Sequence, residues 1–307
     1  MTQVRKFIGF LFCCCQLFAS AQADDSQHIR VLGLQSPGEA SVSYYHDLLQ
    51  LVLNRTKAEY GADRIESLKP PPLGDYRYLL MKQNFIDVHH FGTSPEMERD
   101  LLPVRVPLLA GGLGWRGFII RKTDRQAFRQ IRHLSELKRL TACQGELWPD
   151  SDILRAAGLK VMTAERHDQM LELLRRERCD YFPRSIFEGP VEQKAFAAAY
   201  PDLEYNTSLL LHYPFAMYFF VNKDNKVLAE RLFKGLDKLA RSGELQEFLQ
   251  AHPIAHQVFP LSQFSQSVVF QLDNPLLPAE TPLQQPEYWL KVPVAEAVIA
   301  DQSLRQL

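Results

Sequence analysis

Residues 106–122, VPLLAGGLGWRGFIIRK, decide how the rest of the chain is interpreted. An apolar segment leads through glycines into a strand candidate over 117–121. The glycines of 112–117 match G-x-G-x-x-G, but a dinucleotide site needs a helix after this motif, and here a strand follows. We interpret the glycines as positions where the chain approaches a ligand or a crossing segment closely. We therefore expect no nucleotide and no other cofactor.

Strand and helix candidates alternate on both sides of this stretch. The strand candidates are 30–34, 85–88, 117–121, 140–143, 180–182 and 215–221, and helical spacing of apolar residues marks 45–52, 153–157, 170–174 and 228–250. This alternation predicts an α/β fold with parallel, doubly wound sheets. Prolines recur from Asn274 onward, so we expect an extended arm there without regular structure.

Composition excludes several classes of protein. The chain has 307 residues, of which 46% are hydrophobic and 23% charged, as in ordinary globular proteins of about two domains. It carries 35 basic and 36 acidic residues, so no overall positive charge is available to bind nucleic acid or an anionic membrane surface. No segment is long and apolar enough to span a membrane after cleavage of the leader described next.

The first 23 residues have the pattern of a secretory signal peptide. Arg5 and Lys6 precede an apolar run over 7–18, and small residues follow over 19–23. We expect cleavage there and export, which removes the three cysteines at 13–15 and leaves Cys143 and Cys179. These two could pair in an oxidising compartment if their Cα atoms lie within about 7 Å, which the sequence leaves open. Zinc-ligand spacings are missing, so we expect no metal site.

Three segments have the character of a binding site. The Phe91-Gly92-Thr93-Ser94 segment and the loop 144–149, which contains Gln144 and Trp148, each follow a strand and could present donors or an apolar wall to a ligand. Arg184 would emerge from the strand candidate 180–182. Asp150 or Ser151 is expected to cap the next helix, and Asp150 and Asp152 to complement its dipole rather than act as catalytic acids.

The order of these pieces resembles the periplasmic solute-binding proteins of the polar amino-acid type, family 3, with the type II periplasmic-binding fold. The resemblance covers residues 30–250 and rests on 84–88 before the Gly-Thr-Ser loop, 106–109 leading to 117–122, and 134–138. It continues with 178–182 and with 218–221 before a helix that ends at Ser242-Gly243.

The resemblance implies two α/β lobes joined by two hinge crossovers, with a ligand held between them. Lobe 1 would comprise 24–120 and 213–260, and lobe 2 would comprise 121–212, with 261–307 as the proline-rich arm. The expected role is that of a periplasmic, monomeric protein that delivers a small molecule to a membrane permease, as in an ABC transporter, or to a sensor.

The resemblance also implies roles for single residues. Thr93 and Ser94 match the hydroxyls that take a ligand carboxylate, and Arg99 stands close to the position of the family's arginine. Arg184 occupies the region where the family has an ammonium-binding carboxylate, so we expect an anionic or neutral polar ligand. Phe91, Trp115 and Trp148 would supply apolar walls.

Two other functions fit the same pattern. The first is an enzyme of the dehydratase or hydrolase type on this fold, for which Glu96, Glu146 and Glu188 are the candidate titratable groups. The second is an interaction protein that has kept the fold without a small-molecule ligand. We find no catalytic signature, so a non-enzymatic binding protein is the leading hypothesis.

Overall fold

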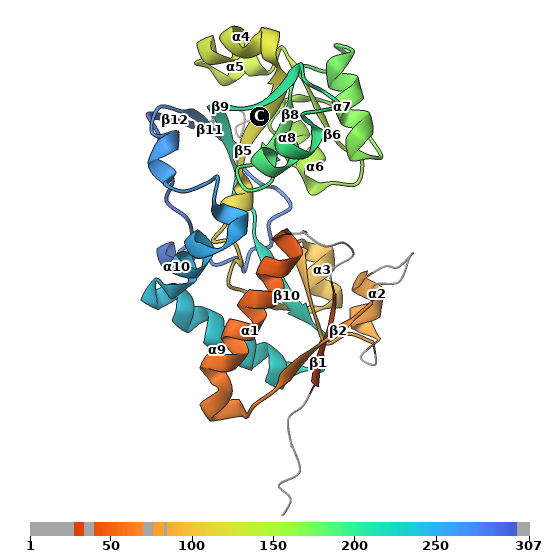
Figure 1. Ribbon diagram of the computed structural model, residues 1–307, viewed down its shortest axis with the longest axis vertical. Helices are drawn as coiled ribbons and strands as arrows, with labels where there is room; N and C mark the ends of the chain where they lie inside the picture. The colour runs from red at the N-terminus through yellow and green to blue at the C-terminus, as the bar shows by residue number, and fades with distance from the viewer. Residues whose placement is uncertain (1–27, 34–39, 70–75, 83–84, 300–307) are drawn as a thin grey trace, which may run out of the picture.

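The computed structural model describes residues 28–33, 40–69, 76–82 and 85–299 (Figure 1). The expected signal peptide, with its three cysteines, lies outside these residues. The described chain forms two α/β lobes stacked along the long axis of the molecule (Figure 1).

The lower lobe in Figure 1 contains two small sheets. One is parallel and the other antiparallel, in the order β3-β10-β4. The strands are β1 (His28–Leu32) paired with β2 (Arg64–Leu68), then β3 (Val88–Gly92), β10 (Met217–Val221) and β4 (Leu102–Val104). The helices of this lobe are α1 (Ala40–Tyr60), α2 (Tyr76–Met81), α3 (Pro95–Asp100) and α9 (Lys226–Ser242), and α10 (Glu244–Ala251) follows α9.

The upper lobe is built on a mixed sheet in the order β12-β11-β9-β5-β8. Its strands are β5 (Trp115–Arg121), β8 (Phe182–Ser185), β9 (Leu203–His212), β11 (Val268–Gln271) and β12 (Glu296–Ile299), and the parallel pair β6 (Thr141–Gly145) and β7 (Lys160–Ala164) lies beside them. The helices are α4 (Arg125–Gln130), α5 (Leu134–Leu137), α6 (Pro149–Ala156), α7 (His167–Arg175) and α8 (Gly189–Phe196). A bridge between Ala142 and Tyr181 links β6 to the chain entering β8.

Helix α9 shows how the sequence pattern produces the packing of the lower lobe. Its leucines at 228, 232, 236 and 239 are all buried, because spacings of three and four residues place them on one face. At Gly235 an added Cβ would lie 2.6 Å from Val52 Cγ1, so the missing side chain lets α9 approach α1 closely. The helix ends at Gly243, whose φ of 84° lies in the left-handed region.

Most expected elements are present, but two strands are displaced along the chain. The strand expected at 85–88 is β3 at Val88–Gly92, and the one expected at 180–182 is β8 at Phe182–Ser185. The sheets mix parallel and antiparallel pairs, whereas the alternation had predicted parallel ones. Strand β5 pairs with β8 and β9, so a lobe boundary before Trp115 fits the sheet better than one after residue 120.

The C-terminal segment differs from the expected arm. After β11 it passes over the lower lobe, where Glu287 forms an ion pair with Arg241 of α9 at 2.5 Å. The Leu290 N–H then donates to the Ala110 carbonyl at 2.7 Å, and the segment returns to pair β12 with β11. This segment has a short 3₁₀ helix at Pro286–Tyr288, and its prolines leave β12 free to join the sheet.

Within the described ranges, no helix combines the length and the apolar character needed to cross a membrane.

Candidate functional site

A chain of paired charges lies on the upper lobe. Arg116 of β5 contacts Asp150 of α6 at 2.8 Å and Glu188 at 3.1 Å. Glu188 also contacts Arg184 of β8 at 3.2 Å, and Arg184 forms hydrogen bonds with Glu192 of α8. We call these five residues the arginine–carboxylate network.

The network is largely removed from water. The side chains of Arg116, Asp150 and Arg184 are 4%, 7% and 9% exposed, and Glu188 is the most open member at 36%. Burial by itself would lower the pKa of Arg116, but the Asp150 carboxylate offsets this effect and the pKa is raised. Both arginines therefore stay charged and each needs its carboxylates.

Arg116 is also held between aromatic rings. Its guanidinium carbon lies 5.6 Å from the ring centre of Tyr213 and 5.5 Å from that of Phe215. The Tyr213 hydroxyl donates to Asp150, the residue that already pairs with Arg116. Phe215 then reaches the lower lobe, because an added Cβ at Gly92 would lie 3.0 Å from its ring. Through Phe215, the network therefore adjoins the contact between the two lobes.

Glu192 closes the network at its outer end. His167 Nε2 lies 3.1 Å from Glu192 Oε2, the oxygen that also accepts a hydrogen bond from Arg184 Nε at 2.8 Å. Burial raises the pKa of Glu192, but His167 and Arg184 outweigh this effect and lower it to about 2.

Aromatic and histidine rings form the facing part of the lower lobe. Tyr45 of α1 stacks on His90 of β3 with ring centres 3.8 Å apart, and His89 lies 4.6 Å from His90. Burial lowers the pKa of His89 to about 4 and holds the pKa of His90 well below its ordinary value, so both rings are neutral at pH 7. Burial raises the pKa of Tyr45, and the negative charge of Glu188 raises it further. A lower-lobe phenol and an upper-lobe carboxylate therefore lie within electrostatic reach of each other.

The residues expected in the loop after β3 serve the lower lobe itself. The Thr93 hydroxyl donates to Glu98 at 2.6 Å, and Ser94 caps α3 by accepting the Met97 N–H at 3.1 Å. The Arg99 side chain is 67% exposed and bonds to its neighbour Asp100. Arg99 therefore does not lie with the two hydroxyls. Phe91 packs edge-on against Phe220 of β10 in a lower-lobe core cluster.

The expected upper-lobe residues lie near the network. Trp148 lies 4.6 Å from the Arg184 guanidinium carbon, measured to the ring centre. Trp115 is buried and stacks on His212 at 4.1 Å, so it packs at the end of β5 and β9. Arg184 pairs with two carboxylates, so it is not an unpaired cation. The expectation of an anionic ligand depended on an unpaired arginine and is not supported.

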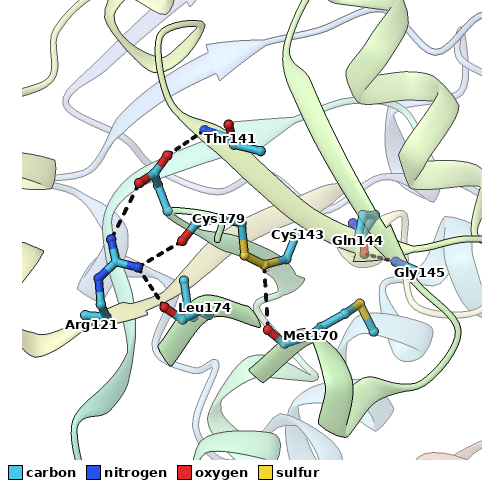
Figure 2. Close-up of a disulfide and its surroundings, with 9 residues drawn as sticks. Arg121, Thr141, Cys143, Gln144, Gly145, Met170, Leu174 and Cys179 are labelled. Atoms are coloured by element: carbon cyan, nitrogen blue, oxygen red, sulfur yellow. Dashed lines mark hydrogen bonds and ion pairs between the residues drawn. A yellow bond between two sulfur atoms is a disulfide. The ribbon is translucent and has the colours of Figure 1, made fainter. Parts of the chain in front are cut away.

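Cys143 and Cys179 form a disulfide in the upper lobe (Figure 2). Cys143 on β6 and Cys179 before β8 are buried, with Cα atoms 5.6 Å apart. Arg121 donates to the carbonyls of Leu174 and Cys179 at 2.7 and 2.9 Å, which holds the same chain segment (Figure 2). The disulfide thus joins the two segments that lead to Asp150 and Arg184.

Gln144 lies next to this disulfide and is fully buried. Its Oε1 accepts the Gly145 N–H at 3.2 Å, while its Nε2 has no hydrogen-bond partner within the described chain. A buried donor of this kind normally has a partner, so Gln144 keeps its place as a candidate contact for a bound molecule.

Four members of the network were not expected from the sequence as site residues: Arg116, Asp150, Glu188 and Glu192. Arg116 lies inside the glycine-rich stretch, where only the glycines were interpreted. Glu188 was considered only as a titratable group of an enzyme. Asp150 was expected to cap α6, but the cap position is Trp148, and Asp150 pairs with Arg116 instead.

Among the residues that the structure describes, no group of three or more histidine, cysteine, aspartate or glutamate side chains could hold a metal ion.

Comparison with solved structures identifies the fold. The chain is similar to a probable amino-acid ABC transporter extracellular-binding protein, ytmK, from Bacillus subtilis, with 15% identity and a TM-score of 0.55 over 75% of this chain and 99% of that one. It is also similar to the VFT2 domain of BvgS from Bordetella pertussis, with 16% identity and a TM-score of 0.53 over 73% and 92%. A third similarity is to a chain from work on glutathione import through GshT and the cystine ABC importer TcyBC of Streptococcus mutans, with 12% identity and a TM-score of 0.51 over 75% and 95%.

No protein-family model matches the chain, and no curated protein matches its sequence. The structural similarities nevertheless agree on one architecture. The chain has the two-lobed, type II periplasmic-binding fold.

Proposed function

From this fold we propose that the protein is an exported, non-enzymatic solute-binding protein that captures a small polar molecule between its lobes. The observation that carries the proposal is the arginine–carboxylate network, whose Arg116 packs on Phe215, a residue that lies against Gly92 of the other lobe. A ligand placed beside these groups would contact both lobes at once, which is what closure around a solute requires.

The charges of the network indicate the ligand class. Two arginines face three carboxylates, so the surface is slightly negative when all five groups are ionised. A neutral or zwitterionic solute with an ammonium group suits Glu188 better than a purely anionic one. The similarity to a probable amino-acid binding protein supports the same class.

The partner would be a membrane permease or a sensor. The similar structures include one binding protein described with an ABC transporter and one domain of BvgS. Delivery to either would take place in the periplasm, which agrees with the expected signal peptide.

A second candidate function follows from the pairing within the network. Arg116 and Arg184 already have carboxylate partners, so the upper lobe can be stable without a ligand. A protein of this kind could keep the fold and act only through protein contacts.

Native mass spectrometry of the protein purified from its export compartment tests the proposal. We expect a co-purifying small molecule, and a rise in Tm when zwitterionic amino acids are added. Glu188→Gln should weaken that binding about tenfold, because it removes a charged partner. Glu165→Gln, an exposed change in the same lobe, is the matched control.

Absence of any bound mass, together with no change in Tm with zwitterionic, cationic or anionic solutes, would contradict solute binding. That result would support the second candidate function.

A further inference from the structure

A polar groove runs along the upper lobe on α4, on residues 204–208 of β9 and on residues 263–268 before β11. Its volume is about 690 Å³, within the range of binding sites in proteins. None of its lining residues belongs to the arginine–carboxylate network. The groove is therefore a separate feature of the molecule.

The groove is positively charged. Arg125, Arg129 and Arg132 line it, with Glu204 as the single acidic residue. Glu204 pairs with Arg125. Arg132 donates to the carbonyls of Arg129 and Ile131, and within the described chain neither Arg129 nor Arg132 has a carboxylate at ion-pair distance. Two guanidinium groups are thus available to an outside anion.

The floor of the groove is an open strand edge. Strand β11 begins opposite Leu209, so residues 203–206 of β9 pair with β5 on one side, and residues 203–208 have no described strand on the other side. Side chains contact the backbone at this edge instead. Gln193 accepts the Tyr205 N–H at 2.7 Å, and the Ser267 hydroxyl donates to the Thr207 carbonyl at 2.6 Å. Such contacts protect an edge, and an added strand can replace them.

We propose that this groove binds an extended acidic peptide segment of a partner protein, which adds as a strand to the β9 edge. Residues 204–208 span roughly 13 Å at about 3.3 Å per residue, enough for a short segment. The backbone of the peptide would pair with β9, and its carboxylates would contact Arg129 and Arg132. Gln193, Gln263 and Gln266 offer both donors and acceptors to its polar atoms.

The charge and the strand edge together favour a peptide over a small anion. A compact anion would use the guanidinium groups, but it would leave the backbone edge unused. An acidic peptide uses both features. This proposal does not depend on the proposed solute-binding function, since the groove shares no lining residue with the arginine–carboxylate network.

Fluorescence polarisation with labelled synthetic peptides tests the proposal on the mature chain. The probe is a seven-residue peptide of alternating glutamate and valine, compared with its glutamine analogue and with an N-methylated version of the same charge. We expect the acidic peptide to bind at least about tenfold more tightly than either comparison peptide, and binding should weaken as salt is raised.

Arg129→Ala combined with Arg132→Ala should weaken acidic-peptide binding about tenfold. Arg175→Ala combined with Arg176→Ala, two exposed arginines of the same lobe that pair with Glu172, is the matched control and should bind like the wild type. If the groove variant does not fold, the relative affinities of the three peptides for the wild-type protein still test the proposal.

Equal binding of the N-methylated peptide would overturn strand addition. Displacement of the peptide by citrate at an equal or lower concentration would show a small-anion site and overturn the peptide assignment. Salt-sensitive dimerisation blocked by the groove variant would show that a second copy of the chain is the occupant, which also overturns it.

Discussion

The upper lobe carries two sets of arginines that behave in opposite ways. Arg116 and Arg184 are buried, and carboxylates surround both of them. Arg129 and Arg132 are exposed in the groove, without a described carboxylate partner. The difference follows from solvation, because a buried cation must be compensated within the protein while water and salt stabilise an exposed one. The first set therefore supports structure, and the second is available for binding.

Breaking the buried set should have the largest effect. Arg116→Met leaves the buried Asp150 carboxylate without its cation, so the free energy of unfolding should fall by about 3 to 5 kcal/mol. Urea unfolding measures this loss. Arg155→Met removes an exposed pair with Asp152 and should cost less than about 1 kcal/mol. Equal losses in the two variants would show that burial does not separate the two sets.

Removing the disulfide tests whether the stability of the upper lobe depends on the link between the segments that lead to Asp150 and Arg184. Replacing Cys143 and Cys179 with alanine opens a loop of sequence separation 36, which should lower the free energy of unfolding by about 4 kcal/mol. Dithiothreitol should destabilise the wild type and leave the double variant unchanged. A variant as stable as the wild type would contradict a structural role for the pair.

Acid should weaken the network through Glu192. Its folded pKa of about 2 lies below the ordinary value of 4.5, so its contribution is present above pH 4.5 and is lost as the pH falls toward 2. The contribution amounts to at most about 3 kcal/mol. Thermal unfolding across this range measures it, and Glu192→Gln should flatten the profile. A profile unchanged by that substitution would be evidence against the assignment.

The groove should give the smallest effect on stability. Arg129→Ala combined with Arg132→Ala should change the free energy of unfolding by less than about 1 kcal/mol, because both side chains are exposed. The same urea experiment measures it. A loss as large as that of Arg116→Met would mean that these arginines are structural too.

Local pattern predicted much of the fold. The leucine face of α9 and the strand after the glycine-rich stretch are confirmed, since each depends on spacing within one segment. The displacement of β3 and β8 reflects partners distant in sequence. Strand β3 pairs with β10, more than a hundred residues later, and such pairing sets where a strand begins.

Prediction of the site was less complete for the same reason. Trp148 and Arg184 were identified by their place after strands, and they lie together in the structure. Thr93 and Ser94 were also identified, but both hydroxyls form hydrogen bonds with α3. Thr93 donates to the Glu98 side chain, and Ser94 accepts the Met97 N–H. Asp150 was expected to cap its own helix, because the sequence does not show that its partner, Arg116, lies 34 positions earlier on β5.

Local spacing and composition were enough to predict strands β1, β3, β5, β6, β8 and β10, the buried leucine face of α9 and the pair of cysteines that remains after cleavage of the expected leader, whereas β2, β4, β7, β9, β11 and β12 were not predicted. The predicted features depend on periodicity and composition, which neighbouring residues carry. Three features became known only from the tertiary structure: the pairing of the charges, the disulfide between Cys143 and Cys179, and the return of the C-terminal segment to the upper sheet. Those outcomes depend on contacts between distant segments, where burial makes an unpaired charge or backbone group costly.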